Sequence, residues 1–153
     1  MKMRPRLLLL MTSLFAFLPS VVGAHLSIGP NQSMAGATEK YVLRVPNDGK
    51  TDIVSAEIDI PEGVTVEAVA IPNGWKHELK RQGDRIVGIV WTMKIPPGQF
   101  AEFGFVARNP RDKTELVWTI RDRTADGTVT DWTKGPNGVR AGSLTKLTPR
   151  PPQ

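Results

Sequence analysis

The sequence contains no cysteine and only two histidines among its 153 residues. Without cysteine the protein has no disulfide, no thiolate metal site and no cysteine nucleophile, so its stability must come from packing. No glycine-rich loop follows an expected strand and opens a helix, which leaves nucleotide binding without support. After the first 24 residues there is no apolar run long enough to span a bilayer and no sustained helical period. The remaining patterns are those of strands and turns.

The first 24 residues have the three-part pattern of a secretory signal peptide. Three cations among the first six residues precede an uncharged, mostly apolar run from Leu7 to Leu18. Val22 and Ala24 then supply the small side chains that signal peptidase requires at positions −3 and −1. We expect cleavage after Ala24, which makes His25 the first residue of the mature chain and places the protein in the periplasm or outside the cell. Cleavage after Gly23 is the alternative, and it would leave Ala24 as the first residue.

The charge of the mature chain is close to balanced. The formal net charge of the full sequence is +5, and the leader supplies three of its cations and none of its acids. The mature chain therefore has 17 Lys and Arg against 15 Asp and Glu. No basic run interleaved with aromatic residues remains, so nucleic acid is not an expected partner.

Short apolar or alternating segments separated by Pro, Gly, Asn and Asp predict strands along the whole mature chain. In Ile53 to Ile60 the apolar residues Ala56 and Ile58 share one face, and Glu57 lies on the other. The economical fold is an antiparallel β-sandwich of the immunoglobulin/fibronectin-III-like kind, at residues 25–135. Residues 136–153, rich in Pro, Gly and cations, are expected to form a tail with room for one short closing strand. The expected strands are 41–45, 53–60, 64–71, 75–81, 86–93, 100–106, 116–120 and 128–132.

His25 has unusual chemistry if it is the mature N-terminus. One residue then offers two nitrogens, the α-amine and ring Nδ1, which together close a chelate ring around a metal ion. The α-amine has an ordinary pKa of about 8, so it loses its proton to a metal more readily than a lysine does. Nitrogen and oxygen donors suit Cu(II). A carboxylate, water or backbone group must complete the site, and the alternative is that His25 is a frayed terminal residue.

Several segments, in order, resemble the YcnI-like family of bacterial secreted copper-binding domains. The resemblance covers residues 25 to about 135. Its most specific piece is PPGQFAEFGF. The matching segments are AHLSIGP, YVLRVPNDG, IDIPEGV, PNGW, IVWTMKIPPGQFAEFGF and DGTVTDW.

The resemblance implies a secreted or periplasmic β-sandwich that binds Cu(II) through a single-histidine brace and acts in copper trafficking, acquisition or homeostasis rather than catalysis. It implies that His25 and Trp132 belong to the site, with Glu57 as the acidic ligand and Asp48 as the second choice. Periplasmic or membrane copper-transport proteins are the implied partners. Many members of the family carry a C-terminal membrane anchor; this sequence ends in TPRPPQ, without one.

Two other functions stay open on the sequence alone. A secreted copper-dependent oxidative enzyme needs a second histidine ligand, and His77 is the only other histidine after the leader. His77 lies in the charged segment WKHELKR, which predicts an exposed strand position. A metal-free β-sandwich that binds a protein or a glycan needs neither histidine.

Trp75, Trp91 and Trp118 are expected to pack in the core or in turns.

Overall fold

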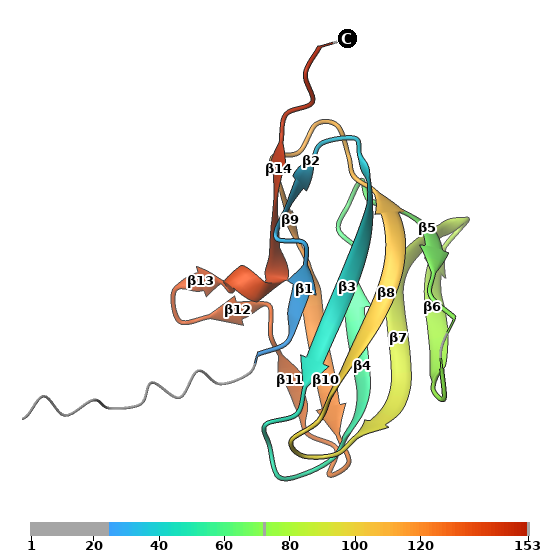
Figure 1. Cartoon of the computed structure of the whole chain (residues 1–153), viewed down its shortest axis with the longest axis vertical. Helices are drawn as coiled ribbons and strands as arrows, with labels where there is room; N and C mark the ends of the chain where they lie inside the picture. The colour runs from blue at the N-terminus through green and yellow to red at the C-terminus, as the bar shows by residue number, and fades with distance from the viewer. Residues whose placement is uncertain (1–24, 72, 153) are drawn as a thin grey trace, which may run out of the picture.

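The computed structural model describes residues 25–71 and 73–152 (Figure 1). Two sheets lie face to face, and a small third sheet joins them along one side. The predicted signal peptide, residues 1–24, lies outside the described residues. Within the described part of the chain, no helix is long and apolar enough to cross a membrane.

The two main sheets are antiparallel throughout, and the predicted antiparallel β-sandwich is confirmed. The four-stranded sheet has the order β1 (Ser27–Gly29), β3 (Thr38–Pro46), β8 (Phe100–Arg108) and β5 (Thr65–Val69). The five-stranded sheet has the order β11 (Val129–Asp131), β10 (Thr119–Thr124), β4 (Ile53–Asp59), β7 (Arg85–Ile95) and β6 (Lys76–Gln82).

The single strand predicted at 116–120 is divided at Trp118. Residues before it form β9 (Glu115–Val117), and residues after it begin β10 in the five-stranded sheet. Trp118 is fully buried; its Nε1 donates to Thr145 Oγ1 at 3.1 Å and its backbone N–H donates to the Ser143 carbonyl at 2.9 Å. These hydrogen bonds fix Trp118 where the chain passes from the third sheet to the five-stranded sheet. Alternation of apolar and polar residues does not reveal such a change of sheet.

The third sheet contains β9, β14 (Leu144–Thr148) and β2 (Gln32–Met34), with β14 in the middle. β14 lies where the sequence left room for a closing strand, but its pairing with β2 is parallel. The sandwich thus continues beyond residue 135, because Thr145 and Leu147 on β14 are buried.

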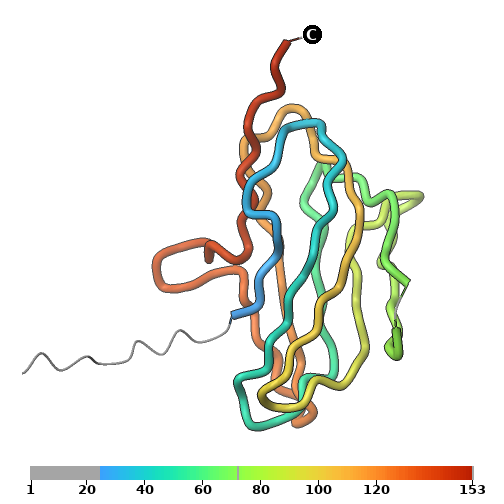
Figure 2. Tube along the Cα trace, in the orientation of Figure 1, coloured from blue at the N-terminus to red at the C-terminus, as the bar shows by residue number. Residues whose placement is uncertain are grey.

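A small hairpin and a short 3-10 helix connect β11 to β14. The hairpin consists of β12 (Lys134–Gly135) and β13 (Gly138–Val139), and the helix η1 spans Ala141–Ser143. The trace in Figure 2 shows the hairpin projecting from the body on the side where the described chain begins. A Cβ on Gly142 would lie 3.0 Å from the Leu26 carbonyl, so a larger residue would push η1 and the start of the chain apart by a few tenths of an ångström.

The core between the two sheets is built from the inward residues of the alternating strands. On β4, Ala56 and Ile58 are fully buried, as their alternation predicts. Aromatic rings fill the centre: Trp91 stacks on Phe103 at 5.0 Å between centroids, and Tyr41 contacts Trp118 at 4.7 Å. Trp91 and Trp118 are therefore core residues, as expected, while Trp75 is partly buried and packs against Phe103.

Tyr41→Phe will lower the free energy of unfolding by about 1–3 kcal/mol, because it leaves a buried acceptor unpaired. Tyr41 is fully buried and its hydroxyl donates to Asn109 Oδ1 at 2.6 Å. Burial raises the pKa of Tyr41 from 10.0 to about 12, so its stabilising contribution is complete below pH 10.0 and is lost as the pH rises through about 12. Urea titrations at pH 8 and 11.5 check this: the difference between wild type and variant should shrink at the higher pH. An equal difference at both pH values contradicts it.

Candidate metal centre

The structure brings two of the predicted site residues together. The imidazole of His25 lies 5.2 Å from the Trp132 ring, measured between centroids, with the planes inclined by 44°. His25 is exposed, whereas the next residue, Leu26, is buried in the core. Leu26 thus anchors the start of the described chain and leaves the histidine at the surface beside the indole.

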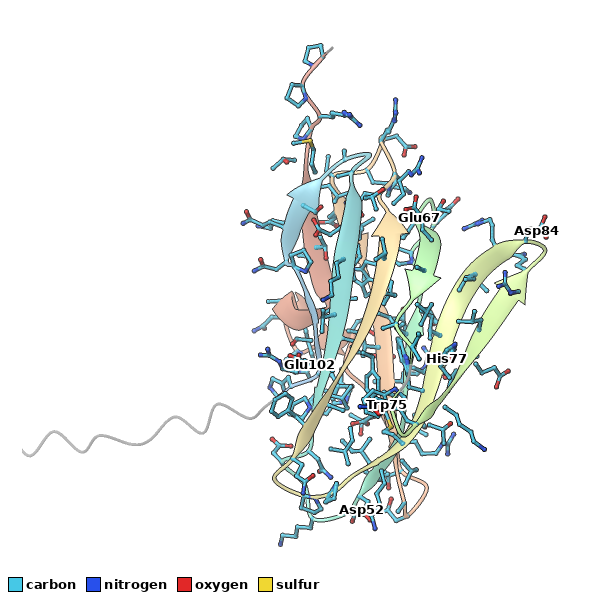
Figure 3. All side chains as sticks on the ribbon, turned by 45° about the vertical axis from the view of Figure 1, so that its right-hand side comes forward. Asp52, Glu67, Trp75, His77, Asp84 and Glu102 are labelled. Carbon is cyan, nitrogen blue, oxygen red and sulfur yellow. The ribbon has the colours of Figure 1, made fainter. Side chains whose placement is uncertain are left out.

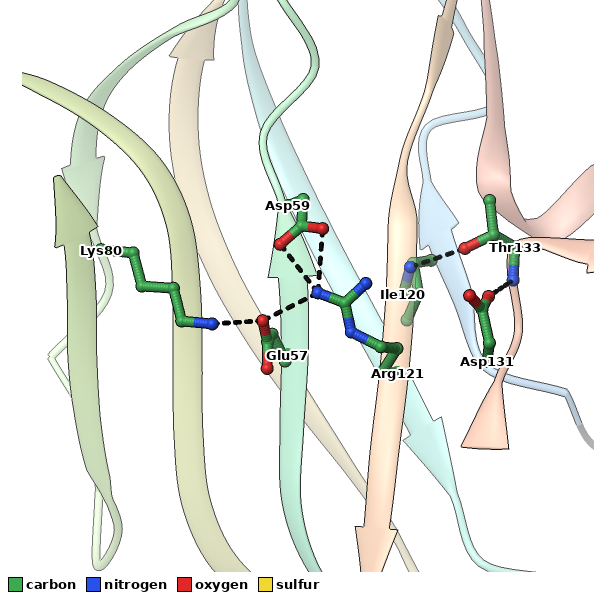
Figure 4. A network of polar contacts seen from close by, with 7 residues as sticks. All are labelled: Glu57, Asp59, Lys80, Ile120, Arg121, Asp131 and Thr133. Carbon is green, nitrogen blue, oxygen red and sulfur yellow. Dashed lines mark hydrogen bonds and ion pairs between the residues drawn. The ribbon is translucent and has the colours of Figure 1, made fainter. Parts of the chain in front are cut away.

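Trp132 is held firmly although β11 ends one residue earlier. Its backbone N–H donates to the Ile120 carbonyl at 2.8 Å, and its own carbonyl accepts from Ser143 Oγ at 3.1 Å. The following residue, Thr133, accepts from the Ile120 N–H through Oγ1 and donates its own N–H to Asp131 Oδ1, as Figure 4 shows. This backbone N–H holds the pKa of Asp131 below its ordinary value. A partly buried indole on such a frame presents a fixed surface to His25.

A buried carboxylate that the sequence analysis did not single out lies next to Trp132. Asp122 is on β10, on the same inward face as Ile120, and only 6% of it is exposed. Burial raises the pKa of Asp122, and polar contacts with the indole N–H of Trp132 and with Thr130 offset only part of this effect. Within the described chain, neither Asp122 Oδ1 nor Trp132 Nε1 completes a hydrogen bond of normal geometry. An acid on the inward side of an alternating strand was the sequence signal that could have found it.

Glu57 lies in a different environment. It is on β4 between the buried residues Ala56 and Ile58, so it points away from the core into which Trp132 packs. Its carboxylate binds Lys80 and Arg121, and Arg121 also binds Asp59 (Figure 4). Burial works to raise the pKa of Glu57, but the two cations outweigh it and hold that pKa below its ordinary value.

Asp48, the second choice for the acid, is exposed on the turn that follows β3. Its neighbour Asn47 is buried and organises this turn: Asn47 Nδ2 donates to the carbonyls of Thr51 and Ile95, and Oδ1 accepts from the Gly49 N–H. The aromatic partner of His25 is Trp132. Among the residues that the structure describes, no aromatic or polar contact links Asp48 to His25 or to Trp132. The turn residues therefore have a structural explanation of their own.

The second histidine is far from the first. His77 is exposed on β6, as predicted, and lies across the sandwich from the start of the described chain (Figure 3). β6 and β11 are the opposite edges of the five-stranded sheet. With strands about 4.8 Å apart, four intervals separate these edges by about 19 Å. His77 and the His25–Trp132 pair therefore cannot share one metal ion.

The surroundings of His25 are poor in ligating side chains. Among the residues that the structure describes, no group of three or more His, Asp or Glu side chains is placed to hold a metal. A cavity of about 650 Å³ opens beside η1 and is lined by Ser27 and Gly142, but not by His25 or Trp132. A metal bound at His25 would therefore need backbone donors as well as side chains, and a free α-amine is such a donor.

Residues 25–151 match the model of a family described as a domain of unknown function, DUF1775. This chain belongs to the DUF1775 family. It is also 29% identical over 135 residues to the copper-binding protein CutI of Bacillus subtilis (strain 168). The match covers 86% of this chain and 66% of CutI, slightly less than two thirds of that protein's length. The resemblance to the YcnI-like family that the sequence predicted is thereby confirmed.

Solved structures support the fold of this DUF1775 domain. An uncharacterized protein from Nocardia farcinica with an immunoglobulin-like fold superposes with a TM-score of 0.66 at 21% identity, over 82% of this chain and 97% of that one. A cohesin module from a Clostridium perfringens family 33 glycoside hydrolase gives a TM-score of 0.53 at 13% identity, with the same coverage of both chains. At these identities the likeness concerns the immunoglobulin-like sandwich alone.

Proposed function

We propose that this protein is a secreted or periplasmic Cu(II)-binding protein of copper trafficking, acquisition or homeostasis, and that it is not an enzyme. Cleavage after Ala24 frees the α-amine of His25, and this amine and Nδ1 bind the copper. A carboxylate is the further ligand, and the Trp132 ring lies beside the bound copper. Copper is the cargo, which the protein holds for periplasmic or membrane copper-transport proteins.

One observation carries the proposal: His25, the expected mature N-terminus, lies against Trp132, and the indole N–H of Trp132 faces a buried carboxylate that is not fully hydrogen-bonded. Buried polar atoms normally have a partner, so an incompletely satisfied Asp122 oxygen points to a ligand. The relative CutI is named as copper-binding, and the family match begins at residue 25. Both facts support the same site.

The donor chemistry favours Cu(II). An amine, an imidazole and a carboxylate are nitrogen and oxygen ligands, which suit Cu(II), whereas Cu(I) favours thiolates and thioethers. The chain has no cysteine. His25 is the one histidine at the candidate site, and His77 is on the opposite edge strand of the five-stranded sheet, which argues against the two-histidine brace of an oxidative copper enzyme. This favours binding over catalysis.

Two carboxylates are candidates for the acidic ligand. Glu57 is the acid that the family resemblance implies, but its Oε1 binds both Lys80 and Arg121 on the outward face of the sheet. Asp122 is on the face of its strand that is turned toward the core, and it contacts Trp132. We propose Asp122 as the ligand and keep Glu57 as the alternative that mutation must separate.

Titration of the mature protein with Cu(II) tests the function. The protein is prepared with His25 as its verified first residue, and spin resonance and indole fluorescence are recorded together. We expect one Cu(II) per chain, nitrogen coordination in the spectrum and strong fluorescence quenching. Most of the quenching should disappear in Trp132→Phe and persist in Trp75→Phe, a matched control because Trp75 packs against Phe103 instead. Absence of stoichiometric binding contradicts the proposed function.

A further inference from the structure

A cation covers the indole of the candidate site. Arg140 follows the β12–β13 hairpin, and its guanidinium Cζ lies 5.7 Å from the centroid of the Trp132 ring. The side chain is half-buried, and no acid of the described chain forms an ion pair with it. Because no carboxylate among the described residues pairs with this half-buried guanidinium, its field is not cancelled by a neighbouring acid, and solvent screens it less than at an exposed position.

The hairpin fixes the position of this cation. Arg140 Nε donates to the Lys134 carbonyl at 3.1 Å, and the backbone N–H of Arg140 donates to the Thr133 carbonyl at 2.9 Å. The side chain lies flat on Gly135, where an added Cβ would be only 3.4 Å from Arg140 Cγ and Cζ. Its charge is therefore held over Trp132 rather than free to swing into solvent.

The guanidinium is close enough to act on a metal at His25. The His25 ring and Arg140 Cζ lie 5.2 Å and 5.7 Å from the same ring centroid, so they are at most 10.9 Å apart. A unit charge at about this distance repels a dication twice as strongly as a monocation, because the energy scales with the product of the charges. Asp122 is an opposing charge near the same indole, so Arg140 offsets part of the attraction that Asp122 exerts on a cation.

We propose that Arg140 is a positioning residue whose fixed charge weakens the hold of the His25 site on Cu(II), so that the metal can be released to a partner. This inference rests on the proposed copper function. The β12–β13 hairpin places a cation beside the candidate metal centre. A protein that only stored Cu(II) would bind it more tightly without this positive charge. Loss of the charge should tighten Cu(II) binding, whereas a role of Arg140 limited to supporting Trp132 predicts that its loss weakens binding.

Three variants of the mature protein separate charge from structure. Arg140→Gln removes the charge and keeps hydrogen-bonding groups, Arg140→Lys keeps the charge, and Lys134→Gln removes an exposed charge from the same hairpin while keeping the carbonyl that Arg140 binds. Cu(II) affinity is measured by competition with a chelator at 20 mM and 500 mM salt. Release to excess chelator is followed by Trp fluorescence.

We expect Arg140→Gln to bind Cu(II) about three- to tenfold more tightly at low salt and to release it correspondingly more slowly. The gain should shrink at high salt because ions screen the charge. Arg140→Lys and Lys134→Gln should stay within about twofold of wild type. Weaker binding in both Arg140 variants, or no change in Arg140→Gln, overturns the inference and leaves the copper function standing. No Cu(II) binding in the wild type overturns both.

Discussion

Acetylation of the His25 α-amine will weaken Cu(II) binding by about a hundredfold or more, equivalent to roughly 3 kcal/mol of binding free energy. The modification leaves the imidazole and its contact with Trp132 in place but removes the second nitrogen of the chelate. Because an α-amine has an ordinary pKa of about 8 and lysine about 10.4, mild acetylation near pH 6.5 is selective for the N-terminus. Competition titration and spin resonance measure the loss.

His25→Ala is the matched control for this experiment, since it keeps a free α-amine and removes the ring. If both nitrogens bind, each modification alone should reduce affinity strongly, and combining them should add little. Lysine acetylation is checked by peptide mass mapping, and the fold by thermal unfolding. An acetylated protein that binds Cu(II) as tightly as the free one, with an unchanged spectrum, would show that the amine is not a ligand.

Asp122→Asn and Glu57→Gln should differ in their effects: the first lowers the Cu(II) affinity, and the second lowers the stability of the metal-free protein. Asp122→Asn will weaken Cu(II) binding by about tenfold or more, as loss of a metal-site acid does. It should leave the metal-free protein equally stable or stabilise it by about 1 kcal/mol, because it removes a buried charge with an unpaired oxygen. Affinity is measured by chelator competition and stability by urea unfolding of the metal-free protein.

Glu57→Gln should keep the Cu(II) affinity within about twofold. It should lower the free energy of unfolding by up to about 1 kcal/mol, since its pairs with Lys80 and Arg121 are partly exposed. Asp48→Asn, on an exposed turn, should change neither quantity. The reverse result, with copper lost in Glu57→Gln and retained in Asp122→Asn, identifies Glu57 as the acidic ligand and rejects Asp122.

Most of the strands could be predicted because their information is local. The alternation in Ile53 to Ile60 corresponds to β4, and WKHELKR corresponds to β6 with its exposed His77. The prediction was wrong at 116–120, where Trp118 divides the segment between two sheets. It also missed β1 and β2, which are three residues each and too short for a period to be recognised.

The candidate site was less accessible from the sequence. His25 could be selected because the expected cleavage would give one residue two nitrogens, and Trp132 because the family resemblance pointed to it. Asp122 had one sequence signal: it is an acid on the apolar face of TIRDRT, which the alternation of that segment could have identified. Arg140 had no sequence signal, because its position over Trp132 depends on the hairpin that turns the chain back after β12.

The sequence by itself determined the β-sandwich and the absence of thiol chemistry, and it predicted His25 as the N-terminal residue of the mature chain. These properties depend on composition, on a two-residue period and on a leader pattern, all of which act over a few neighbouring residues. Only the tertiary structure decided which side chains surround His25. Trp132 contacts His25 although the two are far apart in the chain, and Asp122 and Arg140 contact Trp132 in turn. These contacts form because Leu26 is buried, β10 and β11 pair, and η1 packs closely on the chain start at Gly142.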